Sequence, residues 1–190
     1  MLQHAFKEWA VICRALADGK QAIILRKGGI AEERDAFALE HSRFWLYPTY
    51  VHQQRDGIKP EALPLLEQAE AAKPASVSIR FTHFVEVPGV YQVRDEWAAL
   101  ILNHLHIWSE DTVRKRFQYR EPGLFVLPAR VYRVPQSVEV PEKPEYAGCK
   151  SWVELDRAIA TDGAVPVLDD EAFRDVLRSL DGLLKPTALA

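Results

Sequence analysis

Hydrophobic and polar residues alternate most regularly between Val77 and Val87. Apolar side chains recur there at even spacing, and most of the positions between them are polar. Because successive side chains of a strand point to opposite faces of a sheet, this period of two predicts a strand with one buried face. The apolar positions are Val77, Ile79, Phe81, Val85 and Val87.

A second pattern, near the start of the chain, predicts a β-hairpin. Two apolar runs, Trp9–Leu16 and Gln21–Arg26, are separated by a short polar segment that contains Asp18-Gly19. Asp-Gly between two apolar runs is typical of a tight hairpin turn. The sequence therefore predicts two antiparallel strands joined at residues 17–20.

Two further segments read as strands. Residues 43–53 are rich in aromatic and β-branched side chains, and Pro48 within them favours an edge position or a bulge. Residues 123–134 predict another strand, followed by an extended segment with several prolines up to Pro144.

Helices are predicted where apolar residues follow helical spacing after a capping residue or a proline. Asp95 and Ser109 are the expected N-caps of two of them. The predicted ranges are about 59–72, 95–106, 109–120 and 169–184.

Strands and helices mix without a regular strand–helix–strand alternation. The sequence therefore predicts an α+β fold: a single domain with a mostly antiparallel sheet and three or four helices. We expect residues 1–157 to form the core domain and residues 158–190 to form a C-terminal helical extension packed on that core.

Composition narrows the function classes only slightly. The 190 residues carry a net charge of −3, which argues against a protein that is basic over its whole surface but leaves room for a local basic patch. Cys13 and Cys149 lie far apart, so they predict neither a disulfide framework nor a zinc site, and they fit a reduced, cytoplasmic setting. No apolar run approaches the ~20 residues of a membrane span, so no membrane partner is expected.

The segment after the second predicted strand has the character of an anion site. Arg26 and Lys27 end the strand, and Gly28 and Gly29 follow them directly. Two glycines let the backbone turn so that several amide N–H groups surround an anion, and a neighbouring cation adds charge. The pattern predicts phosphate binding at these four residues, with Lys150 assisting; the alternative is a charged strand end followed by a loop. Adjacent strand residues point to opposite faces, so only one of the two cations can line a given pocket.

Carboxylates and histidines gather between residues 32 and 53. Carboxylate oxygens suit a hard metal ion such as Mg²⁺, so a metal-assisted phosphodiester hydrolase would use Glu40, His41 and His52 as catalytic residues. The identity of the metal stays open. Against this hypothesis, nucleases with an acid-x-Lys signature need a lysine two residues after the acid, and position 42 is Ser. The alternative is a solvated acidic loop.

A basic patch is predicted at the end of the third helix. Arg114, Lys115, Arg116 and Arg120 interleave there with Phe117 and Tyr119. Cations with stacking rings suit a nucleic-acid backbone and its bases. The alternative is a helix whose acids and bases are ordered to complement its dipole.

Five separated motifs together resemble one family. They are Lys7-Glu8-Trp9-Ala10, Arg26-Lys27-Gly28-Gly29-Ile30, Glu40-His41 with Pro48-Thr49, His52-Gln53, and Gly148-Cys149-Lys150-Ser151-Trp152-Val153-Glu154. The chain is similar in these motifs to the bacterial and archaeal domain of unknown function 1802, from about residue 4 to about residue 157. The resemblance implies that the motifs form one unit, and it implies no particular chemistry.

These observations favour a domain that recognises phosphate and that binds or processes nucleic acid. The alternative is a non-catalytic binding or assembly module that acts through a protein partner or a homodimer. Signatures of nucleotide-redox enzymes, serine hydrolases and zinc proteases (GxGxxG, GxSxG, HExxH) are absent from the sequence.

Overall fold

Strand β4 (Ser78–Glu86), predicted from its alternating pattern, lies inside the larger of two sheets in the computed structural model. The structure describes residues 1–27, 39–75, 77–148, 150–184 and 186–187. Within these residues the larger sheet has six strands in the order β8-β1-β3-β4-β7-β9. The other five are β1 (Leu2–Trp9), β3 (Arg43–Thr49), β7 (Arg130–Pro141), β8 (Trp152–Ile159) and β9 (Val165–Pro166).

The six-stranded sheet is mixed. Strands β1 and β3 run parallel, with Ala5 opposite Trp45 and Trp9 opposite Thr49, whereas the other neighbouring pairs run antiparallel. Parallel neighbours need a crossover, which helix α1 (Ala10–Ala17) begins directly after β1. The α+β class and the single domain are confirmed, but the prediction of a mostly antiparallel sheet is wrong.

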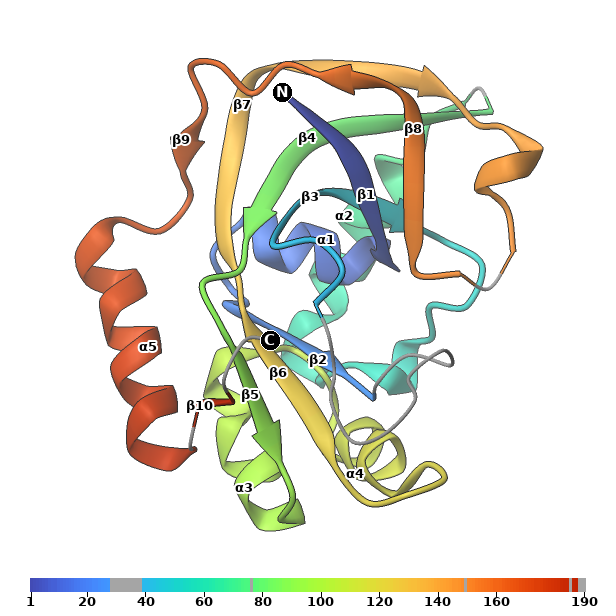
Figure 1. Ribbon diagram of the computed structural model, residues 1–190. Helices are drawn as coiled ribbons and strands as arrows, with labels where there is room; N and C mark the ends of the chain where they lie inside the picture. The colour runs from blue at the N-terminus through green and yellow to red at the C-terminus, as the bar shows by residue number, and fades with distance from the viewer. Residues whose placement is uncertain (28–38, 76, 149, 185, 188–190) are drawn as a thin grey trace.

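A smaller sheet has four strands in the order β10-β5-β6-β2, all antiparallel within the described residues. Figure 1 shows it below the six-stranded sheet, with α3 and α4 beneath it and α5 along one side of the molecule. Its strands are β2 (Ile23–Arg26), β5 (Val90–Val93), β6 (Leu124–Pro128) and β10 (Pro186–Thr187).

The predicted hairpin at the start of the chain is wrong, because its first segment is helix α1. This helix is buried on almost every side, so its sequence is apolar apart from Arg14 and shows no clear helical period. Asp18 and Gly19 end the helix instead of turning a hairpin: Gly19 has φ +67°, and the N–H of Lys20 donates to the carbonyl of Ala15 at 2.9 Å. Asp-Gly thus served as a helix C-terminus, where glycine is equally favoured.

The other four helices lie where the sequence predicted them, so the described residues hold five α-helices. Asp95 and Ser109 cap α3 and α4 as expected, by accepting hydrogen bonds from the N–H groups of Ala98 and Thr112. Trp97 of α3 is 68% exposed. The helices are α2 (Leu63–Ala71), α3 (Glu96–Ile101, continued by a 3-10 turn at Leu102–Leu105), α4 (Glu110–Gln118) and α5 (Asp170–Leu183).

The strand predicted at residues 123–134 is divided between the two sheets. It breaks at Ala129, whose N–H donates to the carbonyl of Ala22 at 2.8 Å, so that β6 belongs to the smaller sheet and β7 to the larger. The proline-containing segment that follows extends β7 to Pro141.

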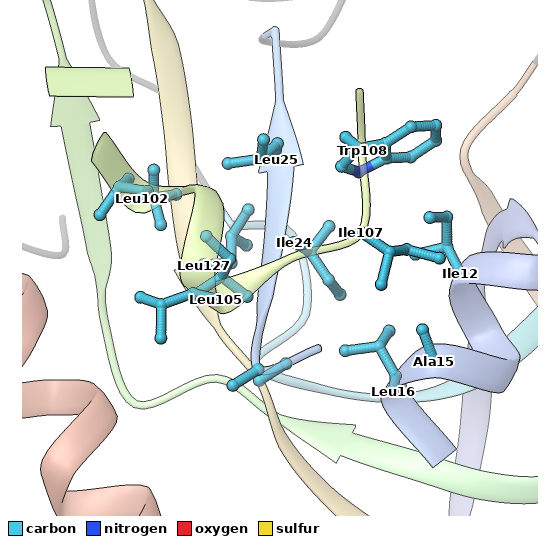
Figure 2. Close-up of a cluster of buried hydrophobic side chains, with 14 of the residues drawn as sticks. Ile12, Ala15, Leu16, Ile24, Leu25, Leu102, Leu105, Ile107, Trp108 and Leu127 are labelled. Carbon is cyan, nitrogen blue, oxygen red and sulfur yellow. The ribbon is translucent and has the colours of Figure 1, made fainter. Parts of the chain in front are cut away.

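The main hydrophobic core lies between the two sheets and includes the inner faces of α1 and α2. Figure 2 shows α1 contributing Ile12 and Leu16 to it, opposite Ile24 of β2 and Ile107. A second cluster, around Trp45, packs on the other face of the six-stranded sheet.

Helix α5 packs on the rest of the chain through a buried stripe. Phe173, Val176 and Leu180 are buried, and the Tyr91 hydroxyl of β5 donates to the Asp181 carboxylate at 2.7 Å. The division of the chain at residue 157 stays a prediction.

Candidate functional site

The C-terminal end of β1 carries a carboxylate into the interior. Glu8 is only 6% exposed, and its Oε1 accepts from the N–H of Trp9 at 2.8 Å. The Thr49 hydroxyl donates to the Glu8 carbonyl at 3.0 Å, and the Gln53 side chain accepts from the N–H of Val11 at 3.2 Å. Thr49 and Gln53, both from the family-like motifs, therefore fix the junction between β1 and α1 that positions Glu8.

Arg26 ends strand β2 and turns its side chain towards β1 and β8. Its guanidinium lies over the Phe6 ring, 4.7 Å from the centroid, and its Nη2 donates to the Ser151 hydroxyl at 2.5 Å. Ring stacking of this kind leaves the edge of the planar guanidinium available for hydrogen bonds.

Arg116 reaches the same region from helix α4. Its guanidinium lies 3.7 Å from the centroid of the Trp108 ring, and its Nη1 donates to the carbonyl of Leu25 at 3.3 Å. Trp108 in turn packs edge-on against Trp9, with the ring centroids 4.8 Å apart. The two arginines therefore stack on separate aromatic rings and meet beside the end of β2.

The electrostatics of Glu8, Arg26 and Arg116 leave one positive charge in excess. Burial lowers the pKa of both guanidinium groups from the ordinary arginine value, and the charge of Glu8 opposes that shift. Arginine keeps its proton across the physiological range even after such a shift, so both groups stay cationic. Neither arginine forms an ion pair with Glu8 within 4.0 Å in the part of the chain that the structure describes.

Most of the hydrogen-bond donors of the two arginines have no partner among the residues that the structure describes. A guanidinium has five N–H groups. Among the described residues, Arg26 donates one hydrogen bond and Arg116 donates one. We call this arrangement of Arg26, Arg116, Glu8 and Ser151 the arginine pair site. Its chemistry is that of an anion site, because bidentate binding of carboxylate or phosphate uses such donors.

Lys27 points away from this site, as expected for adjacent strand residues. Its ammonium donates to three carbonyls at the end of α4 and in the following turn: those of Phe117 (2.9 Å), Glu121 and Gly123 (2.9 Å). An ammonium has three hydrogens, so all are in use. Burial lowers the pKa of Lys27, and Glu121 opposes that shift. Phosphate binding by Lys27 stays a prediction, and it would require Lys27 to release a carbonyl.

Glu40 and His41 lie beside the same aromatic group as Arg26. The His41 ring stacks on His4 with centroids 3.5 Å apart and meets the edge of Trp152 at 5.2 Å, while the Glu40 carboxylate lies 3.7 Å from its Nε2. Trp152 also packs against Phe6, the ring under Arg26. Burial, followed by His4, lowers the pKa of His41, and Glu40 opposes the shift.

His52 is not part of this arrangement. It is exposed in the bend after β3, and its side chain has no partner among the described residues. The predicted set Glu40, His41 and His52 is therefore brought together only in its first two members. Lys150 is exposed next to Ser151, and Gly28 and Gly29 lie outside the described residues.

The predicted basic patch is split between two faces of α4. Arg114 is on the outer face, where its guanidinium pairs with Glu96 and, at 2.7 Å, with Glu110. Arg116 points inward, and Lys115 and Arg120 are exposed. Successive residues of a helix are about 100° apart, so three consecutive cations cannot share one face.

A comparison with known protein families shows which family the chain belongs to. A family model described as Domain of unknown function (DUF1802) matches residues 5–179. The chain belongs to this family. The match extends beyond residue 157 and takes in most of α5, so the expectation that the C-terminal helix lies outside the family is wrong.

Solved structures with a similar course of the chain come from one protein. The crystal structure of ASCH from Zymomonas mobilis is 14% identical over 96% of this DUF1802 chain and 95% of its own, with a TM-score of 0.46. A mutant of the same protein is 14% identical over 93% and 94%, with a TM-score of 0.47. No curated protein matches the sequence.

The sequence had offered a signal for part of the site that it did not predict. Glu8 and Ser151 lie within the motifs that carry the resemblance to DUF1802, but neither was expected to be functional. Phe6 and Trp108 carry no signal, because an aromatic residue under a cation and an aromatic residue in a core have the same sequence pattern.

The described part of the chain contains no cluster of metal-binding side chains and no helix that could span a membrane. Its His, Cys, Asp and Glu side chains form no group of three or more that could hold a metal ion. None of its helices combines the length and the apolar character needed to cross a membrane.

Proposed function

We propose that this DUF1802 protein binds nucleic acid through its phosphates, at the arginine pair site. One observation carries the proposal: Arg26 and Arg116 bring two half-buried guanidinium groups together. Each is stacked on a ring, and most of the donors of each have no partner among the described residues. Arginine held in this way loses little side-chain entropy when a phosphate binds.

The surroundings of the site fit a chain of phosphates better than a single one. Lys150 is exposed beside Ser151, and Lys115 and Arg120 are exposed on and after α4. Tyr119 is 57% exposed, with the Arg120 guanidinium 5.2 Å from its ring centroid, so it offers a face on which a base can stack. Gly28 and Gly29 directly follow Lys27 in the sequence, and we keep them in the proposed phosphate site.

Helix α4 offers a matched pair of variants for the test. Arg116→Gln and Arg114→Gln remove the same charge from the same helix, but only Arg116 belongs to the arginine pair site. We would measure binding of fluorescein-labelled single- and double-stranded RNA and DNA by anisotropy, at several salt concentrations. Thermal unfolding of each variant would show that it is folded.

The expected result separates the two variants. Arg116→Gln should weaken binding about tenfold or more and reduce the slope of log Kobs against log salt by ~0.7 for a single strand, the value of one phosphate contact. Arg114→Gln should change both the affinity and the salt slope by much less. Equal losses in the two folded variants, or no binding by the wild type at low salt, would overturn the proposal.

A processing activity would place Glu40 and His41 beside the bound phosphate. His41 is linked to the ring under Arg26 through Trp152, so it is the strongest candidate for proton transfer, and His52 stays a prediction. Incubation of labelled RNA and DNA with Mg²⁺ or Mn²⁺ tests this version. Cleavage that persists in a His41→Ala variant would exclude the assigned role.

The exposed indole of Trp97 favours a second candidate, a module that acts through a protein partner or a homodimer. Trp97 is 68% exposed on α3, and large aromatic residues are enriched at protein interfaces. Sedimentation of the wild type and of Trp97→Ser tests it: a dimer that dissociates in the variant would support this candidate, and a monomer at all concentrations would argue against a homodimer.

A further inference from the structure

A cavity of about 430 Å³ lies between helices α1 and α2 and the strands β3, β4 and β7. No residue of the arginine pair site lines it. Its volume falls within the ~300–1,000 Å³ that is usual for small-molecule sites. This part of the molecule is therefore separate from the proposed nucleic-acid site and large enough for a ligand of its own.

Small side chains create the space. Both helices turn alanines towards it: Ala10 and Ala17 from α1, and Ala69 and Ala72 from α2. Larger apolar residues at these positions would fill the gap between the helices and the sheet. The helix side of the cavity is thus apolar at these alanines, and the ion pair between Arg14 and Asp18 lies beside them at the end of α1.

The sheet side of the cavity carries polar side chains where the pairing of β4 with β7 is irregular, because four residues of β7 (134–137) lie opposite the single residue Thr82. The register between β4 and β7 shifts between Phe81 and His83, and Thr82 and His83 both line the cavity. In a regular strand these neighbours would point to opposite faces. Bulges that redirect a side chain are common next to functional sites.

The charged residues around the cavity leave one cation without a partner. Arg14 pairs with Asp18 at 2.8 Å, and Arg80 pairs with Glu139 at 2.7 Å. The side chain of Arg133, on β7 opposite His83, has no hydrogen bond or ion pair within the part of the chain that the structure describes. Burial lowers the pKa of His83 to about 4, so the imidazole is neutral at pH 7 and adds no charge.

We propose that this cavity binds a small organic monoanion. Its negative group pairs with the guanidinium of Arg133, and its apolar part lies against the alanine surface of α1 and α2. A single negative charge matches the one unpaired cation, whereas a polyanion would meet the carboxylate of Asp18 in the same lining. The proposal is independent of nucleic-acid binding, because the two sites share no residue.

The test uses acids paired with their neutral amides. Benzoate, indole-3-acetate, hexanoate and 4-phenylbutyrate would each be titrated into the full-length protein, alongside the corresponding amide, and binding followed by protein-observed NMR. Two variants probe the cavity: Arg133→Gln removes its unpaired charge, and Ala17→Leu fills it from the half-buried end of α1. Arg157→Gln, on the exposed face of β8 at the other edge of the sheet, is the control for net charge.

At least one acid should saturate with a Kd below ~1 mM, which corresponds to about 4 kcal/mol, and its amide should bind at least tenfold more weakly. Arg133→Gln should reduce the affinity of the acid to that of the amide, Ala17→Leu should weaken both, and Arg157→Gln should change neither. The proposal is overturned if none of the four acids saturates, if acid and amide bind equally, or if Arg133→Gln and Arg157→Gln have the same effect.

Discussion

The two faces of helix α4 use arginine in opposite ways. On the outer face, Arg114 is surrounded by acceptors, because Glu96 and Glu110 both pair with it. On the inner face, Arg116 shares the electrostatic influence of one carboxylate, Glu8, with Arg26, and most of its donors have no partner within the described residues. A surface arginine that is paired with carboxylates only stabilises its own helix. A half-buried arginine with free donors can also bind an anion from outside, which is the role we propose for Arg116. The difference shows that a run of basic residues in a sequence does not define a patch.

The largest effect should come from Lys27, which closes the end of α4 through three carbonyls. Hydrogen bonds to a charged group contribute ~1.5–3 kcal/mol each when buried, and partial exposure reduces this, so Lys27→Met should destabilise the protein by about 3 kcal/mol in total. Urea unfolding measures the change. The neighbouring Arg26→Met, which removes one hydrogen bond, is the control, and an equal loss in both would contradict the division of roles between these adjacent cations.

Histidines extend the comparison between interior and surface. His106 is buried with both ring nitrogens unpartnered, and burial, followed by Lys59 and Arg116, lowers its pKa to about 3; His104 is exposed. In the unfolded chain the imidazole of His106 takes up a proton near pH 6.5, whereas in the folded protein it stays neutral at that pH. The contribution of His106 to the free energy of unfolding is therefore complete above pH 6.5 and is lost as the pH falls. Between pH 7 and pH 5 the loss from His106 should be roughly 2 kcal/mol.

Urea unfolding at the two pH values checks this loss. The pH-dependent difference should shrink in His106→Phe and should persist in His104→Gln. A wild type whose stability does not change between these values would show that His106 is not held neutral by the fold.

Glu8 tests the charge balance of the arginine pair site from the inside. Glu8→Gln keeps a side chain that can accept from Trp9 but removes the one carboxylate that, among the described residues, acts on both arginines. We expect a loss of about 1 kcal/mol in stability, because the two cations then repel without compensation. Affinity for single-stranded RNA or DNA should rise several-fold in the same variant. Glu154→Gln, on an exposed position of β8, should affect neither quantity.

Local sequence patterns correctly predicted those helices and strands that have one face buried and the other exposed to water. The alternation of β4, the caps at Asp95 and Ser109, and the stripe of α5 each express one buried face, so period and capping chemistry were sufficient. Helix α1 failed for the opposite reason: it is buried on almost every side, and its single charged residue, Arg14, was too little to mark a helical period.

The candidate site was predicted only in part, because its members come from distant segments. Arg26 was found from the local run of cations and glycines that follows β2. Its partners are Arg116, 90 positions away, and Ser151, 125 positions away, and no local pattern joins them. The same limit explains the basic patch, since the sequence listed four cations and only the packing of α4 decided which of them points inward.

The smallest change in stability is expected for Arg114, the arginine on the outer face of α4. Arg114 is 44% exposed in its side chain, and its two partners are Glu96 and Glu110 on the surface. Exposed ion pairs contribute little to stability, so Arg114→Gln should leave the free energy of unfolding almost unchanged. The change should become smaller still at high salt, where such pairs are screened. A loss larger than that of Arg116→Gln would mean that the outer face stabilises α4 more than the inner face does. The contrast between a satisfied surface arginine and an available inner one would then have to be reversed.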